Sequence, residues 1–104
     1  MSGRDWLAHR ELSPPRVLRE RVEALARSVP DRSDDPSESL LDAAEEALGA
    51  IARRPPADDR ATALDLLAVD ALITYALEAA AERPETIPDV SARAMSRLSR
   101  VAVR

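Results

Sequence analysis

The chain has 104 residues, a length that suits one domain with a modest core. Charged residues make up 33% of it, the net charge is −4, and there is no cysteine, which excludes disulfides, thiol nucleophiles and thiolate metal sites. The most apolar stretch, residues 61–81, contains three carboxylates, and this argues against a membrane-spanning helix.

Prolines punctuate the sequence, and the segments between them carry apolar residues at the three- and four-residue spacing of helices. No segment alternates apolar and polar residues for long enough to indicate a strand. We therefore predict an all-α fold, a compact bundle of four helices. The expected helices cover about residues 13–29, 36–54, 58–83 and 88–102.

The first twelve residues have too few apolar side chains to predict a helix of their own. We expect residues 1–12 to be an N-terminal arm that is either flexible or docked, and Trp6, Leu7 and Leu12 are the side chains that would dock it. Residues 13–104 would then form a single helical domain.

The first predicted helix begins at Ser13, a good N-cap, followed by Pro14 and Pro15 at positions where the missing N–H groups cost nothing. An apolar stripe follows at spacings of four, three and four residues. It consists of Leu18, Val22, Leu25 and Val29. Pro30 ends the helix, because the residue before a proline avoids helical backbone angles.

The second predicted helix has the clearest start: Asp35 is the N-cap, Pro36 the first helical residue, and Glu38 completes a capping box. Its expected buried face consists of Leu40, Leu41, Ala44, Ala47, Leu48 and Ile51. Its acidic side chains are expected to point away from the core; these are Asp42, Glu45 and Glu46.

The third predicted helix is the longest, roughly 40 Å at 1.5 Å per residue. Its apolar residues form two arcs on a helical wheel, and a helix this apolar is normally buried on most sides. The first arc is Leu64, Ala68, Ala71, Leu72, Tyr75 and Ala79. The second arc is Leu66, Val69, Ile73, Ala76, Leu77 and Ala80. Because three shorter helices offer one stripe each, we expect the second arc to be an oligomer interface.

Asp65 lies between the two arcs, and two interpretations stay open. The favoured one is a buried ion pair with an arginine from a neighbouring helix, since ion pairs perturb acids more often than catalysis does. The other is a carboxylate in a ligand pocket, with Tyr75 and Arg97 as the further polar groups.

The fourth predicted helix has an apolar inner face of Ile87, Val90, Ala94, Leu98 and Val101. An arginine stripe runs beside it, made of Arg93, Arg97, Arg100 and Arg104. The favoured interpretation is that the stripe is solvated or docks on the acidic face of the second helix. The alternative is contact with an anionic partner, and nucleic acid is disfavoured because the domain is acidic and has two aromatic residues.

Catalytic, phosphate-binding and metal-binding motifs are absent, and the single histidine, His9, lies in the arm. Residues 66–74 resemble the "LAGDALLT" helix of polyprenyl synthases. The aspartate-rich motif of that family is missing, since Asp34 and Asp35 are followed by Pro36, and the chain is too short for that fold. No site residue is carried over, and no cofactor or metal is expected.

These patterns lead to one main functional expectation. The chain is interpreted as a non-catalytic helical module for protein–protein interaction or oligomerisation, most simply a homodimer. The first alternative is a small-ligand-binding domain or minor enzyme with a pocket near Asp65, and the second is nucleic-acid contact through the arginine stripe. Because no apolar signal region occurs near Met1, a cytoplasmic protein is expected.

Overall fold

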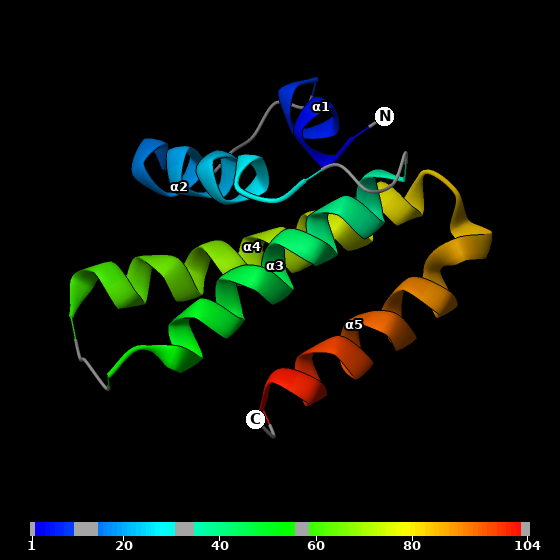
Figure 1. The fold of residues 1–104 in the computed structure, drawn as a ribbon. Coiled ribbons are helices and arrows are strands. Elements are labelled where there is room, and N and C mark those ends of the chain that lie inside the picture. The colour runs from blue at the N-terminus through cyan, green and yellow to red at the C-terminus, as the bar shows by residue number, and fades with distance from the viewer. Residues whose placement is uncertain (1, 10–14, 31–34, 56–58, 103–104) are drawn as a thin grey trace.

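The structure is a computed structural model that describes residues 2–9, 15–30, 35–55 and 59–102. All regular structure within these ranges is helical, which confirms the all-α bundle (Figure 1). The helices are α1 (Gly3–Ala8), α2 (Arg16–Arg27), α3 (Pro36–Arg53), α4 (Arg60–Ala81) and α5 (Ile87–Ala102), with a 3-10 turn, η1 (Pro84–Thr86), directly before α5.

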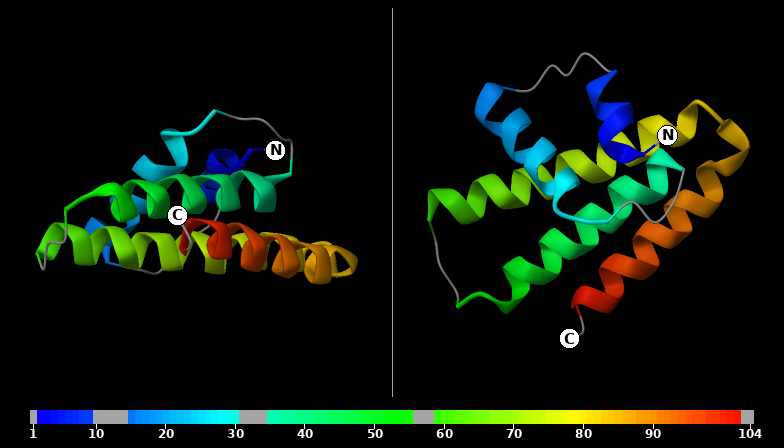
Figure 2. Two further views of the ribbon diagram at one scale, coloured as in Figure 1. Left: turned by 60° about the horizontal axis from the view of Figure 1, so that its bottom comes forward. Right: turned by 45° about the horizontal axis from the view of Figure 1, so that its top comes forward.

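Helices α3 and α4 form a central antiparallel hairpin, and the other helices pack on it (Figure 1). Helices α1 and α2 lie on one side of the hairpin, and α5 lies on the other side, where it contacts both α3 and α4 (Figures 1 and 2). Helix α5 follows the same direction as α3 (Figure 2). This arrangement leaves α4 covered by α2, α3 and α5 but not around its whole circumference.

Local capping explains where the central helices begin. The Asp35 carboxylate accepts the Ser37 N–H at 3.0 Å, as predicted for the start of α3. Glu38, predicted to complete a capping box, instead pairs with arginines of α5. Helix α4 begins after Asp59, whose carboxylate accepts the Thr62 N–H at 2.7 Å. The hydrogen bond lowers the pKa of Asp59, because it favours the charged form.

Two predicted helices extended two residues too far at their C-terminal ends. Helix α2 ends at Arg27 and α4 at Ala81, where Ser28 and Glu82 already make the tight backbone bonds of a terminal turn. The predicted N-cap of the first helix, Ser13, lies outside the described residues.

Helix α1 corrects the expectation that the first residues have no helix of their own. Its six residues are too few for an isolated helix. The Ser2 hydroxyl caps it by accepting the Asp5 N–H at 3.1 Å, and Trp6 and Leu7 are buried in the core. Tertiary burial of two large side chains therefore supplies the stability that local propensity lacks.

The core is made of aliphatic side chains from every one of the four longer helices. Val22, Leu40, Leu72 and Val90 are fully buried and come from α2, α3, α4 and α5 in turn. Helices α3 and α4 pack against each other and carry buried alanines, whose small side chains allow neighbouring backbones to approach closely; these are Ala43, Ala44, Ala68 and Ala76. Together with Trp6 and Leu7 of α1, these residues form one core that joins all five described α-helices.

The two glycines are expected to respond in opposite ways to alanine. A Cβ on Gly3 would lie 2.9 Å from the buried Ser39 Oγ and 3.1 Å from Leu40 Cδ2, so Gly3→Ala should lower the free energy of unfolding by about 1 kcal/mol through overpacking. A Cβ on Gly49 meets only the end of the exposed Arg53 side chain at 3.3 Å. Gly49→Ala should therefore stabilise α3 by about 0.5–1 kcal/mol. Urea denaturation of both variants tests the difference in sign.

Candidate functional site

Asp65 is the one buried carboxylate among the described residues, and α4 carries it near its N-terminus with 5% of its surface exposed. Its Oδ1 accepts the Nε–H of Arg21 at 2.6 Å, and its Oδ2 accepts an Nη1–H of Arg54 at 2.8 Å. Arg21 comes from α2, and Arg54 is the C-cap of α3. The triad therefore ties together three helices, α2, α3 and α4.

The triad holds Asp65 in its charged form. The hydrogen bond from Arg21 lowers the pKa of Asp65 below its ordinary value of 3.8, burial opposes this, and the bond from Arg54 adds to the lowering. A catalytic acid or base working near neutral pH would need a raised pKa and a free oxygen. Asp65 has neither, since both oxygens already accept from an arginine.

A small hollow of about 200 Å³ adjoins this triad between α2, α3 and α4. Besides the triad, it is lined by Leu25, Ser28, Glu46, Ala47 and Ala50. Ligand pockets usually enclose about 300–1,000 Å³. The hollow is smaller than this range and carries two arginines and two carboxylates, so its charges balance within the chain.

The other two residues of the predicted pocket lie elsewhere, and this corrects the expected grouping. The Tyr75 ring packs against the Trp6 ring, with centroids 6.3 Å apart. Arg97 reaches α3 from α5 and pairs with Asp42 and Glu38. The sequence could not show that Tyr75 and Arg97 lie away from Asp65, because the positions of α1 and α5 relative to α4 depend on long-range packing.

The arginine stripe of α5 faces the acidic residues of α3 and forms a ladder of ion pairs. Arg93 pairs with Glu38, Arg97 with Asp42, and Arg100 with Glu45 at 3.9 Å. Each pair joins residues 55 positions apart, as two helices running in the same direction require.

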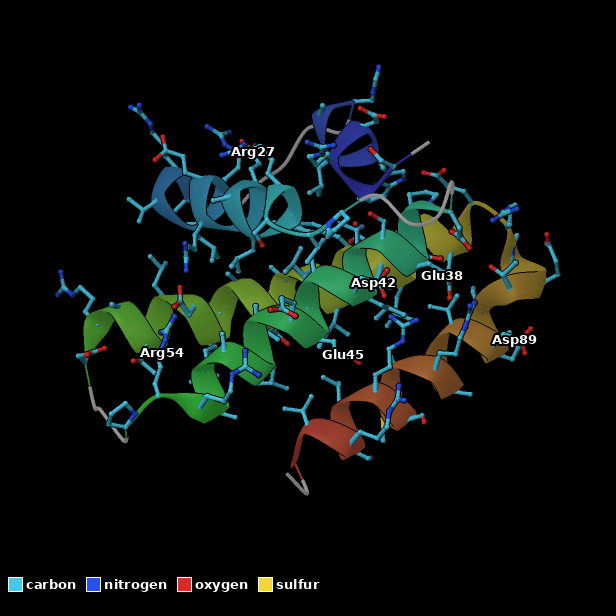
Figure 3. All side chains as sticks on the ribbon, in the orientation of Figure 1. Arg27, Glu38, Asp42, Glu45, Arg54 and Asp89 are labelled. Atoms are coloured by element: carbon cyan, nitrogen blue, oxygen red, sulfur yellow. The ribbon has the colours of Figure 1, made fainter. Side chains whose placement is uncertain are left out.

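Figure 3 shows the three acids in order along α3, on the side toward α5. Asp42 and Glu45 contact α5, in agreement with the interpretation that the arginine stripe docks on the acidic face of this helix, whereas Glu46 is exposed. The fourth residue of the stripe, Arg104, lies outside the described residues. The described arginines of the stripe are thus engaged inside the chain.

Half of the second arc of α4, the predicted oligomer interface, is buried within the chain itself. Val69, Ala76 and Ala80 are buried against the helices that pack on α4. Leu66 and Leu77, by contrast, stay 46% and 36% exposed.

A different row of residues remains uncovered along α4, and we call it the outer face of α4. Its members are all exposed: Ala63, Leu66, Leu67, Asp70, Thr74, Leu77 and Ala81. Leu67 is 56% exposed and was absent from the predicted interface. The spacing of three and four residues along this row was available in the sequence, but only the packing of α2, α3 and α5 reveals which row is left free.

Within the described ranges, no group of three histidine or acidic side chains is placed to hold a metal ion. Across the same part of the chain, every helix is too short or too polar to cross a membrane. Comparison of the chain with protein-family models, curated proteins and solved structures finds no match.

Proposed function

We propose that this chain is a non-catalytic helical module that self-associates through the outer face of α4. The observation that carries the proposal is the contrast between its charged and apolar surfaces. The triad around Asp65 and the ladder between α3 and α5 pair their charges within the chain, whereas three leucines of one helix face stay exposed. Exposed apolar rows of this kind commonly mark interaction sites.

The alternative functions have less support from the same contacts. A ligand site or enzyme at Asp65 would need an unoccupied polar group, and both Asp65 oxygens are engaged by arginines. Nucleic-acid contact through α5 would need free guanidinium groups, and Arg93, Arg97 and Arg100 already contact carboxylates of α3.

A second copy of the chain is the occupant that the outer face suits best. A symmetric dimer places the same patch on both subunits, so the patch must complement itself. The outer face has an exposed alanine at each end and, four positions closer to the centre from each alanine, an exposed leucine. These residues are Ala63, Leu67, Leu77 and Ala81. A copy turned end for end therefore meets side chains of matching size and polarity.

Sedimentation velocity at several concentrations tests the proposal. The wild-type chain should form a dimer, and Leu66→Asp should weaken it about 100-fold, because each leucine occurs twice in a symmetric interface and burying one contributes about 1.5 kcal/mol. Met95→Asp is the matched control, since Met95 is 68% exposed on α5 and not on the outer face.

The control variant should dimerise like the wild type. A wild-type chain that stays monomeric at every concentration would contradict the proposal. So would equal dimerisation of the Leu66 and Met95 variants, because the contact would then lie elsewhere.

A further inference from the structure

We propose that Asp70 and Thr74 are the residues that set the orientation of this dimer, by hydrogen-bonding across an antiparallel two-fold contact between two α4 helices. This inference rests on the proposed self-association. It adds the geometry of the pair and assigns a role to the two polar residues at the centre of an otherwise apolar row.

The order of residues along the outer face supports an antiparallel pairing. Thr74 follows Asp70 by four positions, and the nearest exposed leucines, Leu67 and Leu77, lie three positions before Asp70 and three after Thr74. A two-fold axis through the α4 surface near position 72 therefore places Leu67 opposite Leu77 of the second copy and Asp70 opposite its Thr74. Each central contact then joins a carboxylate acceptor to a hydroxyl donor.

A parallel pairing in register lacks this match. It would place Asp70 opposite Asp70 of the second copy, and like charges brought together at an interface are unfavourable. Polar residues at single positions of a helix–helix seam are known to select register and orientation at a cost in affinity. Asp70 and Thr74 occupy that position here, since both are exposed and both lie between the leucines.

The local contacts leave both side chains available for this role. In the described part of the chain, no hydrogen bond or ion pair engages the Asp70 carboxylate. The Thr74 hydroxyl donates to the backbone carbonyl of Asp70 at 3.1 Å, a bond within one helical turn. Such local bonds contribute little, so the hydroxyl can exchange this acceptor for a carboxylate of the second copy.

The absence of cysteine makes a direct test possible with single introduced thiols. Ala63→Cys and Ala81→Cys place thiols at opposite ends of the outer face, about 27 Å apart along the helix at 1.5 Å per residue. In an antiparallel dimer, position 63 of one copy lies beside position 81 of the other. A short bismaleimide should therefore link the two variants when they are mixed and leave each variant alone unlinked.

Removing the central pair tests the role of Asp70 and Thr74. In an Asp70→Leu, Thr74→Leu background, each single-cysteine variant should begin to cross-link with itself, because parallel pairing is no longer penalised. Asp70→Glu keeps both the acceptor for the hydroxyl and the negative charge, and it should preserve linking in the mixture only. Circular dichroism of each variant confirms that it has folded before it is cross-linked.

The outcomes separate the two proposals. Self-linking of either single-cysteine variant in the native background would overturn the antiparallel pairing. Linking that still occurs only in the mixture after both polar residues are replaced would overturn their role. A chain that sediments as a dimer without any cross-link overturns this inference alone, whereas a chain that sediments as a monomer overturns the proposed function as well.

Discussion

Asp65→Ala is expected to lower the free energy of unfolding by about 3 kcal/mol, the cost typical of removing one partner from a buried ion pair. Two arginines would lose their carboxylate at once, and the contact that joins α2 and α4 to the end of α3 would be lost. Arg21 and Arg54 are themselves 36% and 42% exposed, so they can turn toward water, which keeps the loss from being larger.

Glu46→Ala is the matched control, because Glu46 lines the same hollow but is exposed. Its effect should stay within about 0.5 kcal/mol of zero, as is usual for surface substitutions. Urea denaturation of both variants supplies the comparison. Equal stability of the Asp65 variant and the wild type would show that the triad does not hold the helices together.

Asp65→Ala should also make the free energy of unfolding depend less on pH. The pKa of Asp65 is lowered in the folded state, so the unfolded chain takes up a proton first as pH falls below about 4. The stability that Asp65 contributes is complete above its unfolded pKa and is lost as pH falls through its lower folded pKa. The gap between the wild type and Asp65→Ala should therefore be constant near neutral pH and shrink under acid conditions.

Trp6→Ala is expected to destabilise the fold by about 3 kcal/mol, as for other large-to-small changes in a core. Trp6 is 4% exposed, and its Nε1–H donates to Glu82 Oε1 at 2.8 Å, which connects α1 to the end of α4. Helix α1 is too short to persist without this docking, so its helical signal should disappear together with the stability.

Thermal unfolding followed by circular dichroism measures this loss, since the variant has no tryptophan left to report it by fluorescence. Glu82→Gln keeps an acceptor for the indole N–H and should cost no more than about 1 kcal/mol. An unchanged melting temperature of the Trp6 variant would mean that α1 contributes nothing to the folded state.

The features that depend on neighbouring residues could be predicted from the sequence. Asp35 and Pro36 mark the start of α3, and the apolar spacing around Val22 marks the buried side of α2, because caps and periodicity act within a few residues. Helix α1 could not be predicted in this way, since the burial of Trp6 depends on helices far along the chain.

At the candidate site, too, local features could be predicted and contacts between distant residues could not. That Asp65 would be buried followed from its place between two apolar arcs, but its partner Arg21 lies 44 positions away, and nothing local links the two. The same limit applied to the second arc of α4, because whether Val69 faces a second copy or the core of its own chain depends on how the other helices pack on α4.

The ladder between α3 and α5 also has an evolutionary consequence. Because its three pairs share one offset of 55 positions, a residue inserted between Glu38 and Glu45 would break at least one pair unless a matching insertion occurred between Arg93 and Arg100. The linker around η1 carries no such constraint from the ladder. Related sequences should therefore vary in length at the linker around η1, whereas residues 38–45 and residues 93–100 should gain or lose positions only together.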